Sequence, residues 1–152
     1  MKIRRLLVDG YSLLHSAPEF SKYIRTGMDI GRERVLQRVR LAIPDLAPAA
    51  TVVFDGREGS LEDLAHIQVV YAPANKTADA VIERMVADAD RPQELMVVTA
   101  DRAERDTASG FGAQVMSCVQ FLELTGRVRP ENAPRSRKKK LGTLGDVFPP
   151  PR

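Results

Sequence analysis

IRRLLVD, residues 3–9, is an apolar stretch that ends in a carboxylate, and the same pattern occurs twice more along the chain. ATVVFD (50–55) and LMVVTAD (95–101) are the other two stretches. Continuous apolar runs of this length are typical of buried strands in a parallel sheet. Because ligands bind outside the carboxyl ends of such strands, the sequence predicts that the three terminal aspartates gather at one edge of a sheet.

Stretches with helical periodicity separate the apolar runs, which predicts an α/β fold whose parallel sheet is covered on both faces. The predicted strands span residues 3–8, 50–54, 68–71, 95–99 and 114–116. The clearest helix follows Thr77, where apolar residues recur at helical spacing as far as Ala89. An earlier helix is expected to end at Pro44, and shorter ones are predicted over 102–109 and 118–124.

Length and composition predict one soluble globular domain, since the chain has 152 residues, 43% hydrophobic and 28% charged. The net charge of +3 is uneven, because residues 131–152 carry +4. We therefore predict a domain over residues 1–128 and a basic, Pro-rich, flexible tail over residues 129–152. The tail is equally compatible with a tether to RNA or a ribosome and with a solubilising role.

Cysteine usage and hydropathy favour a reduced, cytoplasmic setting. Cys118 is the only cysteine, so an intramolecular disulfide is excluded, and a packing role is expected for it. No stretch of the sequence has the length and apolarity of a signal peptide or a membrane span, so no membrane partner is expected.

A fourth carboxylate belongs with the three strand ends, because Asp79 lies in the first turn of the helix after Thr77. Crowded carboxylates repel one another unless a cation binds them. Magnesium prefers oxygen ligands, and bound magnesium or manganese supports phosphodiester hydrolysis. Asp9, Asp55, Asp79 and Asp101 together therefore predict a divalent-metal site.

Each carboxylate also has a purely structural interpretation. Asp101 with Glu104 fits a helix cap with a capping box, and Asp79 suits the first turn of any helix. Asp9 and Asp55 each precede a glycine, as is common in turns. For any one of these aspartates taken alone, the structural interpretation is favoured. The repeated use of aspartate at strand ends, where Ser, Thr or Asn would also cap, favours a shared site.

Five segments resemble the YacP-like branch of the NYN domains, which belongs to the PIN-like nucleases. They are LLVDGYSLLH (6–15), VVFDG (52–56), TADAVIER (77–84), VVTADRAERD (97–106) and GAQVMSCVQFLEL (112–124). The resemblance covers about residues 3–125. It implies a three-layer, Rossmann-like α/β/α domain with a mostly parallel sheet, here of five strands. It also implies a ribonuclease, with endonucleolytic attack favoured, that uses one or two Mg²⁺ or Mn²⁺ ions.

The resemblance assigns roles by position. It makes Asp9, Asp79 and Asp101 the metal ligands. It places Ser12, Thr99, Glu83 and Glu104 as supporting residues, and we place Asp55 at the rim. The family's usual DGYN reads DGYS here, so Ser12 stands where an asparagine amide is usual. Residues 56–67 also form a shorter stretch than is usual in the family.

An acidic site that binds RNA needs cations nearby. Arg57, Lys76, Arg102 and Arg105 lie beside the proposed ligands and are the predicted phosphate contacts. Tyr11, next to Asp9, suits either stacking on a base of single-stranded RNA or packing. We expect the two histidines, His15 and His66, to be polar surface residues rather than metal ligands.

Two other functions fit the same residues. One is a non-catalytic RNA- or ribosome-binding module of the same fold, which the serine at position 12 makes conceivable. The other is a small-molecule phosphohydrolase. The sequence contains neither GxGxxG nor GxxxxGK[ST], and Asp9 lacks the second aspartate two residues on that one phosphatase class uses. The phosphohydrolase is therefore the weakest of the three interpretations.

Overall fold

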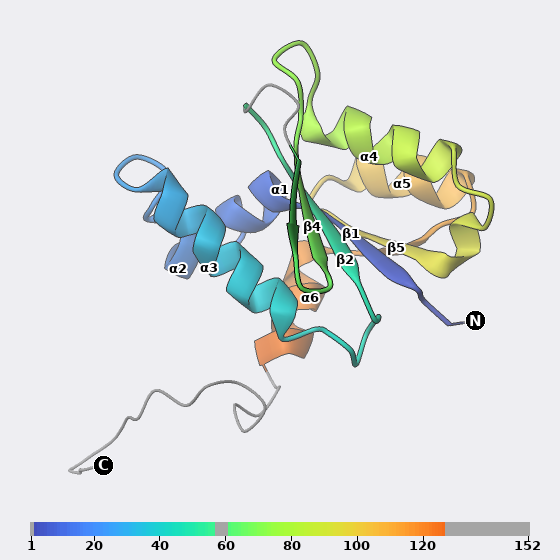
Figure 1. Cartoon of the computed structure of the whole chain (residues 1–152), viewed down its shortest axis with the longest axis horizontal. Coiled ribbons are helices and arrows are strands. Elements are labelled where there is room, and N and C mark those ends of the chain that lie inside the picture. The colour runs from blue at the N-terminus through green and yellow to red at the C-terminus, as the bar shows by residue number, and fades with distance from the viewer. Residues whose placement is uncertain (1, 57–60, 127–152) are drawn as a thin grey trace.

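The computed structural model describes residues 2–56 and 61–126, which form a sheet flanked by helices (Figure 1). The strands are β1 (Arg5–Asp9), β2 (Ala50–Phe54), β3 (Leu61–Leu64), β4 (Ile67–Tyr71), β5 (Leu95–Val98) and β6 (Gln114–Met116). The helices are α1 (Gly10–His15), α2 (Pro18–Ser21), α3 (Met28–Arg40), α4 (Ala78–Ala87), α5 (Arg102–Gly110) and α6 (Cys118–Gly126), with a short 3-10 helix, η1 (Pro92–Glu94).

The strand order β3-β4-β2-β1-β5-β6 creates a point where the chain changes direction across the sheet. The first crossover runs from β1 to its neighbour β2, whereas the connection after β4 passes to β5 on the other side of β1. Connections therefore diverge at the carboxyl ends of β1, β2 and β5. In open parallel sheets this is the place where ligands bind.

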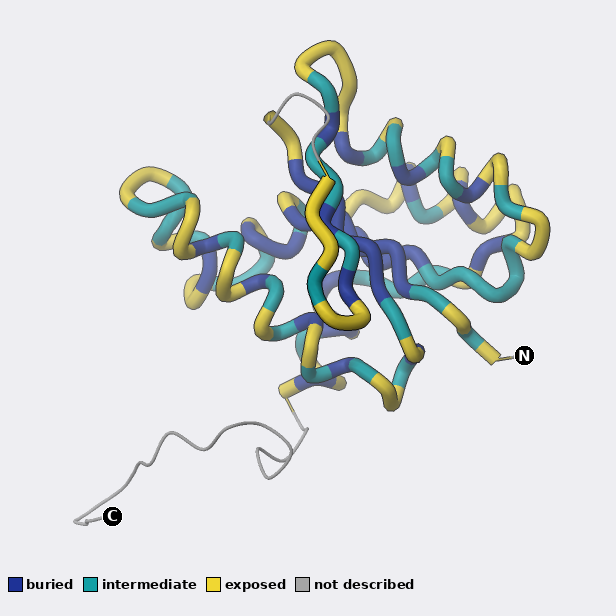
Figure 2. The backbone as a smooth tube through the Cα atoms, viewed as in Figure 1, coloured by how far each residue is buried: buried dark blue, intermediate teal, exposed yellow. Residues whose placement is uncertain are grey.

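Side chains that alternate along the strands fill two cores, one on each face of the sheet. Leu6 and Val8 of β1 pack with residues of α1, α2, α3 and α6, whereas Leu7 between them packs with α4 and α5. Figure 1 shows α4 and α5 on the opposite side of the sheet from α2 and α3. In Figure 2 the central strands are buried, while the outer faces of the helices are exposed. The predicted three-layer α/β/α class is confirmed.

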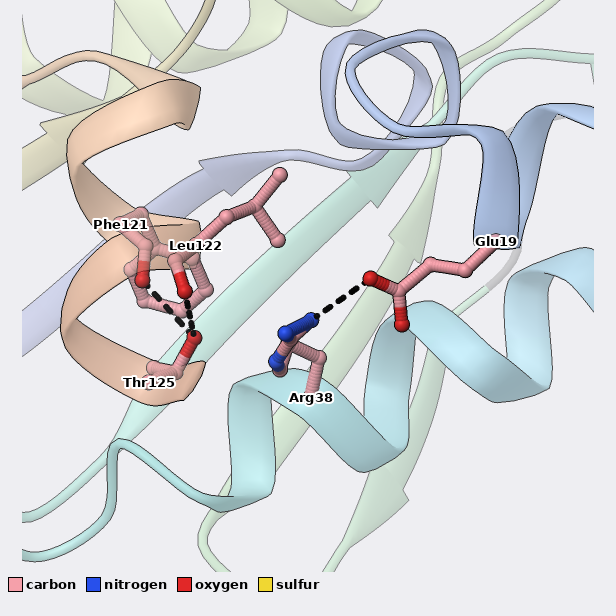
Figure 3. Close-up of polar contacts among 5 residues, drawn as sticks. All are labelled: Glu19, Arg38, Phe121, Leu122 and Thr125. Atoms are coloured by element: carbon pink, nitrogen blue, oxygen red, sulfur yellow. Dashed lines mark hydrogen bonds and ion pairs between the residues drawn. The ribbon is translucent and has the colours of Figure 1, made fainter. Parts of the chain in front are cut away.

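Polar side chains on the α2/α3/α6 face are satisfied within the fold (Figure 3). Arg38 Nη1 lies 3.4 Å from Glu19 Oε1, and the Arg38 guanidinium lies over the ring of Phe20 at 5.8 Å from its centroid. Thr125, buried near the end of α6, donates its hydroxyl to the carbonyl of Phe121 at 2.8 Å. The Arg38–Glu19 ion pair therefore joins α3 to α2, and the Thr125 bond lies within α6.

The predicted count of five strands is wrong, because β3 adds a sixth strand antiparallel to β4. Leu61, Glu62 and Asp63 are exposed, as Figure 2 shows for this edge of the sheet. A strand with no buried face has no apolar alternation to reveal it. The β3–β4 turn passes through His66, whose φ of +64° lies in the left-handed region.

The other predicted elements are present with small changes at their ends. The helix expected to stop at Pro44 ends at Arg40 and is followed by turns over residues 41–46. The apolar stripe predicted a helix as far as Ala89, but α4 ends at Ala87. No helix among the described residues is long and apolar enough to cross a membrane. The predicted tail, residues 129–152, lies outside the described residues.

The α4 core allows a matched test of the fold. Ile82 has no exposed surface, whereas Ile30 on α3 is 50% exposed. We expect Ile82→Ala to lower the free energy of unfolding by about 2–5 kcal/mol, because it leaves a cavity, and Ile30→Ala to lower it by less than about 1 kcal/mol. Urea denaturation followed by circular dichroism measures both. Equal effects of the two substitutions would contradict the described packing of α4.

Candidate active site

A cleft of about 460 Å³ opens at the carboxyl ends of β1, β2 and β5, at the point where the connections diverge. The residues that line it are Asp9, Tyr11, Ser12, His15, Ser16, Asp55, Thr77, Ala78, Asp79, Ala100, Asp101 and Glu104. All four aspartates singled out in the sequence are in this set, together with one glutamate. Five carboxyl groups from β1, the β2 end, α4 and the start of α5 therefore meet in one cleft.

Three of these carboxyl groups form a compact cluster. Asp79, Asp101 and Glu104 each offer one oxygen, and these oxygens all lie within 4.8 Å of one another. The cluster shares Asp79 and Asp101 with the predicted ligands and adds Glu104, while Asp9 lines the same cleft, so the predicted ligand set stays a prediction. Oxygen donors at such separations suit a hard divalent cation, which binds carboxylates readily.

Glu104 is directed into the site rather than into the cap of its own helix. Asp101 accepts from the backbone N–H groups of Ala103 (2.9 Å) and Glu104 (3.4 Å), as an ordinary N-cap does. In a capping box Glu104 would reach back to the N–H of Asp101. That N–H donates instead to Thr99 Oγ1 at 3.2 Å, and the Glu104 carboxyl turns inward. Only half of the expected capping box is formed.

Thr99 does not line the cleft itself but links residues that do. Its hydroxyl has one proton, which it donates to Glu104 Oε1 at 2.8 Å. The second hydroxyl nearby, Ser12 Oγ, lies 3.1 Å from Thr99 Oγ1 and must therefore be the donor in that pair. Thr99 is fully buried, and its bond to Glu104 is shielded from water, whereas the bond from Ser12 is only partly buried. The proton order Ser12 to Thr99 to Glu104 points two hydroxyl dipoles at the Glu104 carboxylate.

The other oxygen of Glu104 faces a different environment. Glu104 is only 2% exposed, and its Oε2 finds no hydrogen-bond donor among the described residues. Burial, and then the charge of Asp9, raise the pKa of Glu104 to about 8. Burial also raises the pKa of Asp9, whereas the backbone N–H of Ser12 lowers it. The two carboxyl groups are close enough to share a hydrogen bond when one is protonated.

These observations allow a test of whether a divalent cation fits the cleft. A buried carboxylate oxygen without a donor is energetically costly, and it requires either a proton or a cation. The Asp79, Asp101 and Glu104 oxygens converge at the distances given above, and Asp9 adjoins Glu104. The residues therefore fit a divalent ion, which would replace the proton that the raised pKa of Glu104 otherwise favours.

The strand-end aspartates cap helices and face the cleft at the same time. Asp9 Oδ1 accepts from the backbone N–H of Ser12 at 3.1 Å and so caps α1. Asp55 Oδ1 accepts from the N–H of Ala78 at 2.8 Å, which ties the end of β2 to the first residue of α4. Asp79 follows Ala78 directly. The predicted rim position of Asp55 thus corresponds to a contact that positions the helix carrying Asp79.

Several predicted site residues lie outside the cleft. Glu83, Lys76 and Arg102 are not among its lining residues. Arg105 Nη1 donates to the Thr99 carbonyl at 2.8 Å, so its guanidinium braces the strand end. Arg57 lies outside the described residues. The phosphate contacts assigned to these four basic residues stay predictions.

The structure also places residues that the sequence did not assign to the site. His15 and Ser16 line the cleft, although a single helical turn after Asp9 gives little periodicity from which to predict their direction. Cys118 is 1% exposed, and burial raises the pKa of its thiol to about 11. Packing explains Cys118, because a thiol with this pKa is not a nucleophile at neutral pH.

The fold and the cleft define a Rossmann-like α/β/α domain with an acidic site at the switch point of a parallel sheet. The family model of the YacP-like NYN domain matches residues 6–143. The chain therefore belongs to the YacP-like NYN domain family, as the sequence motifs predicted.

Solved structures agree with this assignment. Two crystal structures of Rae1 (YacP) from Bacillus subtilis are similar, one of them of a W164L mutant. The mutant has 23% sequence identity and a TM-score of 0.70, with 83% of this chain and 77% of that chain covered. The other has 25% identity and a TM-score of 0.69, with 84% and 75% covered. A search of curated proteins found no match.

The contact between Asp55 and α4 leads to a prediction about stability. Asp55→Ala removes the acceptor for the Ala78 N–H, and we expect it to lower the free energy of unfolding by about 1 kcal/mol. Asp55→Asn keeps an oxygen in place and is expected to lose less. Urea denaturation measures both, and hydrogen exchange of the Ala78 amide locates the effect. If Ala and Asn have the same effect, the capping contact is not what Asp55 contributes.

The raised pKa of Glu104 predicts a pH-dependent stability of the metal-free protein. Between pH 4.5 and about 8 Glu104 is protonated when folded but ionised when unfolded, so folding takes up a proton. The contribution of Glu104 to stability should be complete below pH 4.5 and be lost as pH rises to about 8, by up to about 1.4 kcal/mol per pH unit. The raised pKa of Asp9 acts in the same direction.

Urea denaturation in the presence of a chelator, repeated across this pH range, measures the slope. Glu104→Gln should remove most of it, since glutamine keeps the shape without the titration. Glu123→Gln, at an exposed position on α6, is the matched control and should keep the slope of the parent protein. A parent protein with flat stability over the range would contradict the buried pairing with Asp9.

Proposed function

We propose that the protein is a divalent-metal-dependent ribonuclease that hydrolyses RNA phosphodiester bonds. The observation that carries the proposal is the convergence of Asp79, Asp101 and Glu104 at a cleft on the switch point of the sheet. Membership of the YacP-like NYN family supports it, since the resemblance to PIN-like nucleases implies RNA as substrate. Magnesium and manganese are the expected ions, and endonucleolytic attack is the expected mode.

The chain's own residues have distinct tasks in this reaction. Asp79, Asp101 and Glu104 would hold the ion, with Asp9 beside them. A bound divalent ion neutralises charge on the phosphate and lowers the pKa of an attacking water. Thr99 fixes the Glu104 carboxylate through its hydroxyl and the Asp101 backbone through the N–H that it accepts. Outer hydrogen bonds of this kind keep ligands in position.

The helices that begin at the cleft favour a phosphate group there. Thr77 and Ala78 at the start of α4, and Asp101 at the start of α5, all line the cleft. The N-terminus of a helix carries a partial positive charge and attracts anions. Because Asp55 and Asp101 already occupy first-turn amides of α4 and α5, a phosphate would be held chiefly through the bound ion. A cytoplasmic setting and ribosome involvement stay predictions.

Cleavage of a labelled single-stranded RNA in manganese tests the proposal. We expect Asp79→Asn and Asp101→Asn each to reduce the cleavage rate by at least about 100-fold, because each removes a charged oxygen that would hold the ion. Asp106→Asn is the matched control. Asp106 is exposed on α5, the helix that Asp101 caps, and it lies outside the cleft. It should cleave at the parental rate.

The same experiment separates the alternatives. Manganese affinity of each variant, measured by calorimetry, should fall for Asp79→Asn and Asp101→Asn but not for Asp106→Asn. Parent protein that binds RNA and manganese without cleaving would favour the non-catalytic module. Equal cleavage by the parent and Asp101→Asn would attribute the activity to a contaminant and refute the proposal.

A further inference from the structure

The two walls of the cleft differ in chemistry. The wall formed by the starts of α4 and α5 carries the carboxyl cluster, whereas α1 contributes Tyr11 and His15. Tyr11 and His15 are the only ring side chains among the described residues that line the cleft. They are four positions apart on one helix, so both project from the same face.

The two rings contact each other at the surface. Their centroids are 4.4 Å apart and their planes meet at 72°, an edge-to-face arrangement. Tyr11 is 40% exposed, and His15 is also exposed. In an edge-to-face pair one ring supports the other while ring surface stays accessible. The pair therefore offers a held aromatic surface at the mouth of the cleft.

Core packing does not account for these rings. The residues of α1 that fill the core are Leu13 and Leu14, both with no exposed surface. Tyr11 belongs to neither core cluster, in contrast to Tyr71, which packs against the core and stacks on Phe54 at 5.9 Å. An aromatic ring that is spared from the core and held beside a cleft is available to a ligand.

We propose that Tyr11 and His15 form a stacking subsite for one unpaired base of the RNA, next to the scissile phosphate. The inference rests on the proposed ribonuclease function and adds to it the kind of nucleotide that the cleft accepts. Aromatic side chains bind unpaired bases through their faces, which a duplex keeps stacked on neighbouring pairs. When the phosphate lies at the acidic wall, the base of the adjoining nucleotide would lie against the wall formed by α1. The subsite thus selects single-stranded RNA.

Stacking is measured independently of cleavage with a fluorescent base. A short uridine RNA carries one 2-aminopurine, moved position by position, and is titrated with the Asp101→Asn protein in manganese so that it stays intact. Quenching of the fluorescence reports stacking of that base. We expect quenching at one position only, with weaker binding when that base is replaced by an abasic ribose.

Substitutions of the rings, made in the same background, complete the test. Tyr11→Ala should abolish the quenching and weaken binding about 5- to 150-fold, whereas Tyr11→Phe should behave as the parent protein. His15→Ala should give an intermediate loss, because it removes the support of the tyrosine ring. Tyr23→Ala, at a tyrosine outside the cleft, is the control and should leave the quenching and the RNA affinity unchanged. Thermal melting verifies that each variant is folded.

The outcomes separate the subsite from the proposed function. Suppose that the protein cleaves RNA, and that Tyr11→Ala changes neither the quenching nor the KM. This result would refute the subsite and leave the ribonuclease proposal standing. Suppose instead that quenching occurs at one position and Tyr11→Ala abolishes it, but that the protein does not cleave RNA. This result would support the subsite and refute the ribonuclease proposal. Absence of quenching at every position would refute the subsite. With both proposals correct, Tyr11→Ala raises KM far more than it lowers kcat.

Discussion

Burying a carboxyl group costs free energy unless hydrogen bonds or an opposite charge compensate for the lost water. Within the described part of the chain, only one of the two carboxyl oxygens of Glu104 has such a hydrogen bond. Thr99 donates to Oε1, while Oε2 has no donor among the described residues, and the charge of Asp9 acts on the same carboxyl group. The protein must therefore accept a proton there or bind a cation, and a chain selected for stability alone would place an apolar or amide side chain at this position. The cost is understandable if a cation belongs to the working protein.

A capping role and the proposed role in holding an ion are compatible for the aspartates of the cleft. Asp9 and Asp101 cap the helices that follow them, and Asp55 caps α4 from a different strand. A carboxylate has two oxygens, each with two lone pairs, so one oxygen can fix the backbone while the group still faces the cleft. The caps even serve the site, since they hold each carboxyl group in a set direction. A capping pattern in a sequence is therefore weak evidence against function at the carboxyl end of a parallel strand.

The central strands and the gathering of their terminal aspartates were predictable because both follow from continuous apolar runs and parallel topology. The exposed β3 was missed, since an edge strand without a buried face has no periodic signal. The part of Glu104 in the compact cluster was hidden for another reason. The sequence motif at Asp101 and Glu104 is that of a capping box, and only the geometry shows that Thr99 takes over half of it. His15 is exposed, as predicted, but its place on the cleft was not predicted because one turn of helix does not define a face.

Serine at position 12 changes what α1 offers to a ligand rather than how α1 is held. Its backbone N–H donates to Asp9, its carbonyl accepts from Ser16 at 2.6 Å, and its hydroxyl donates to Thr99. These bonds join α1 to the ends of β1 and β5, so the architecture survives the loss of an asparagine amide. Because Ser12 donates its hydroxyl proton to Thr99, its side chain has no proton left to donate to a bound molecule. The side chains that α1 can present to the cleft are then chiefly Tyr11 and His15, which is why the proposed contact of that wall with RNA is one of ring faces rather than of hydrogen bonds.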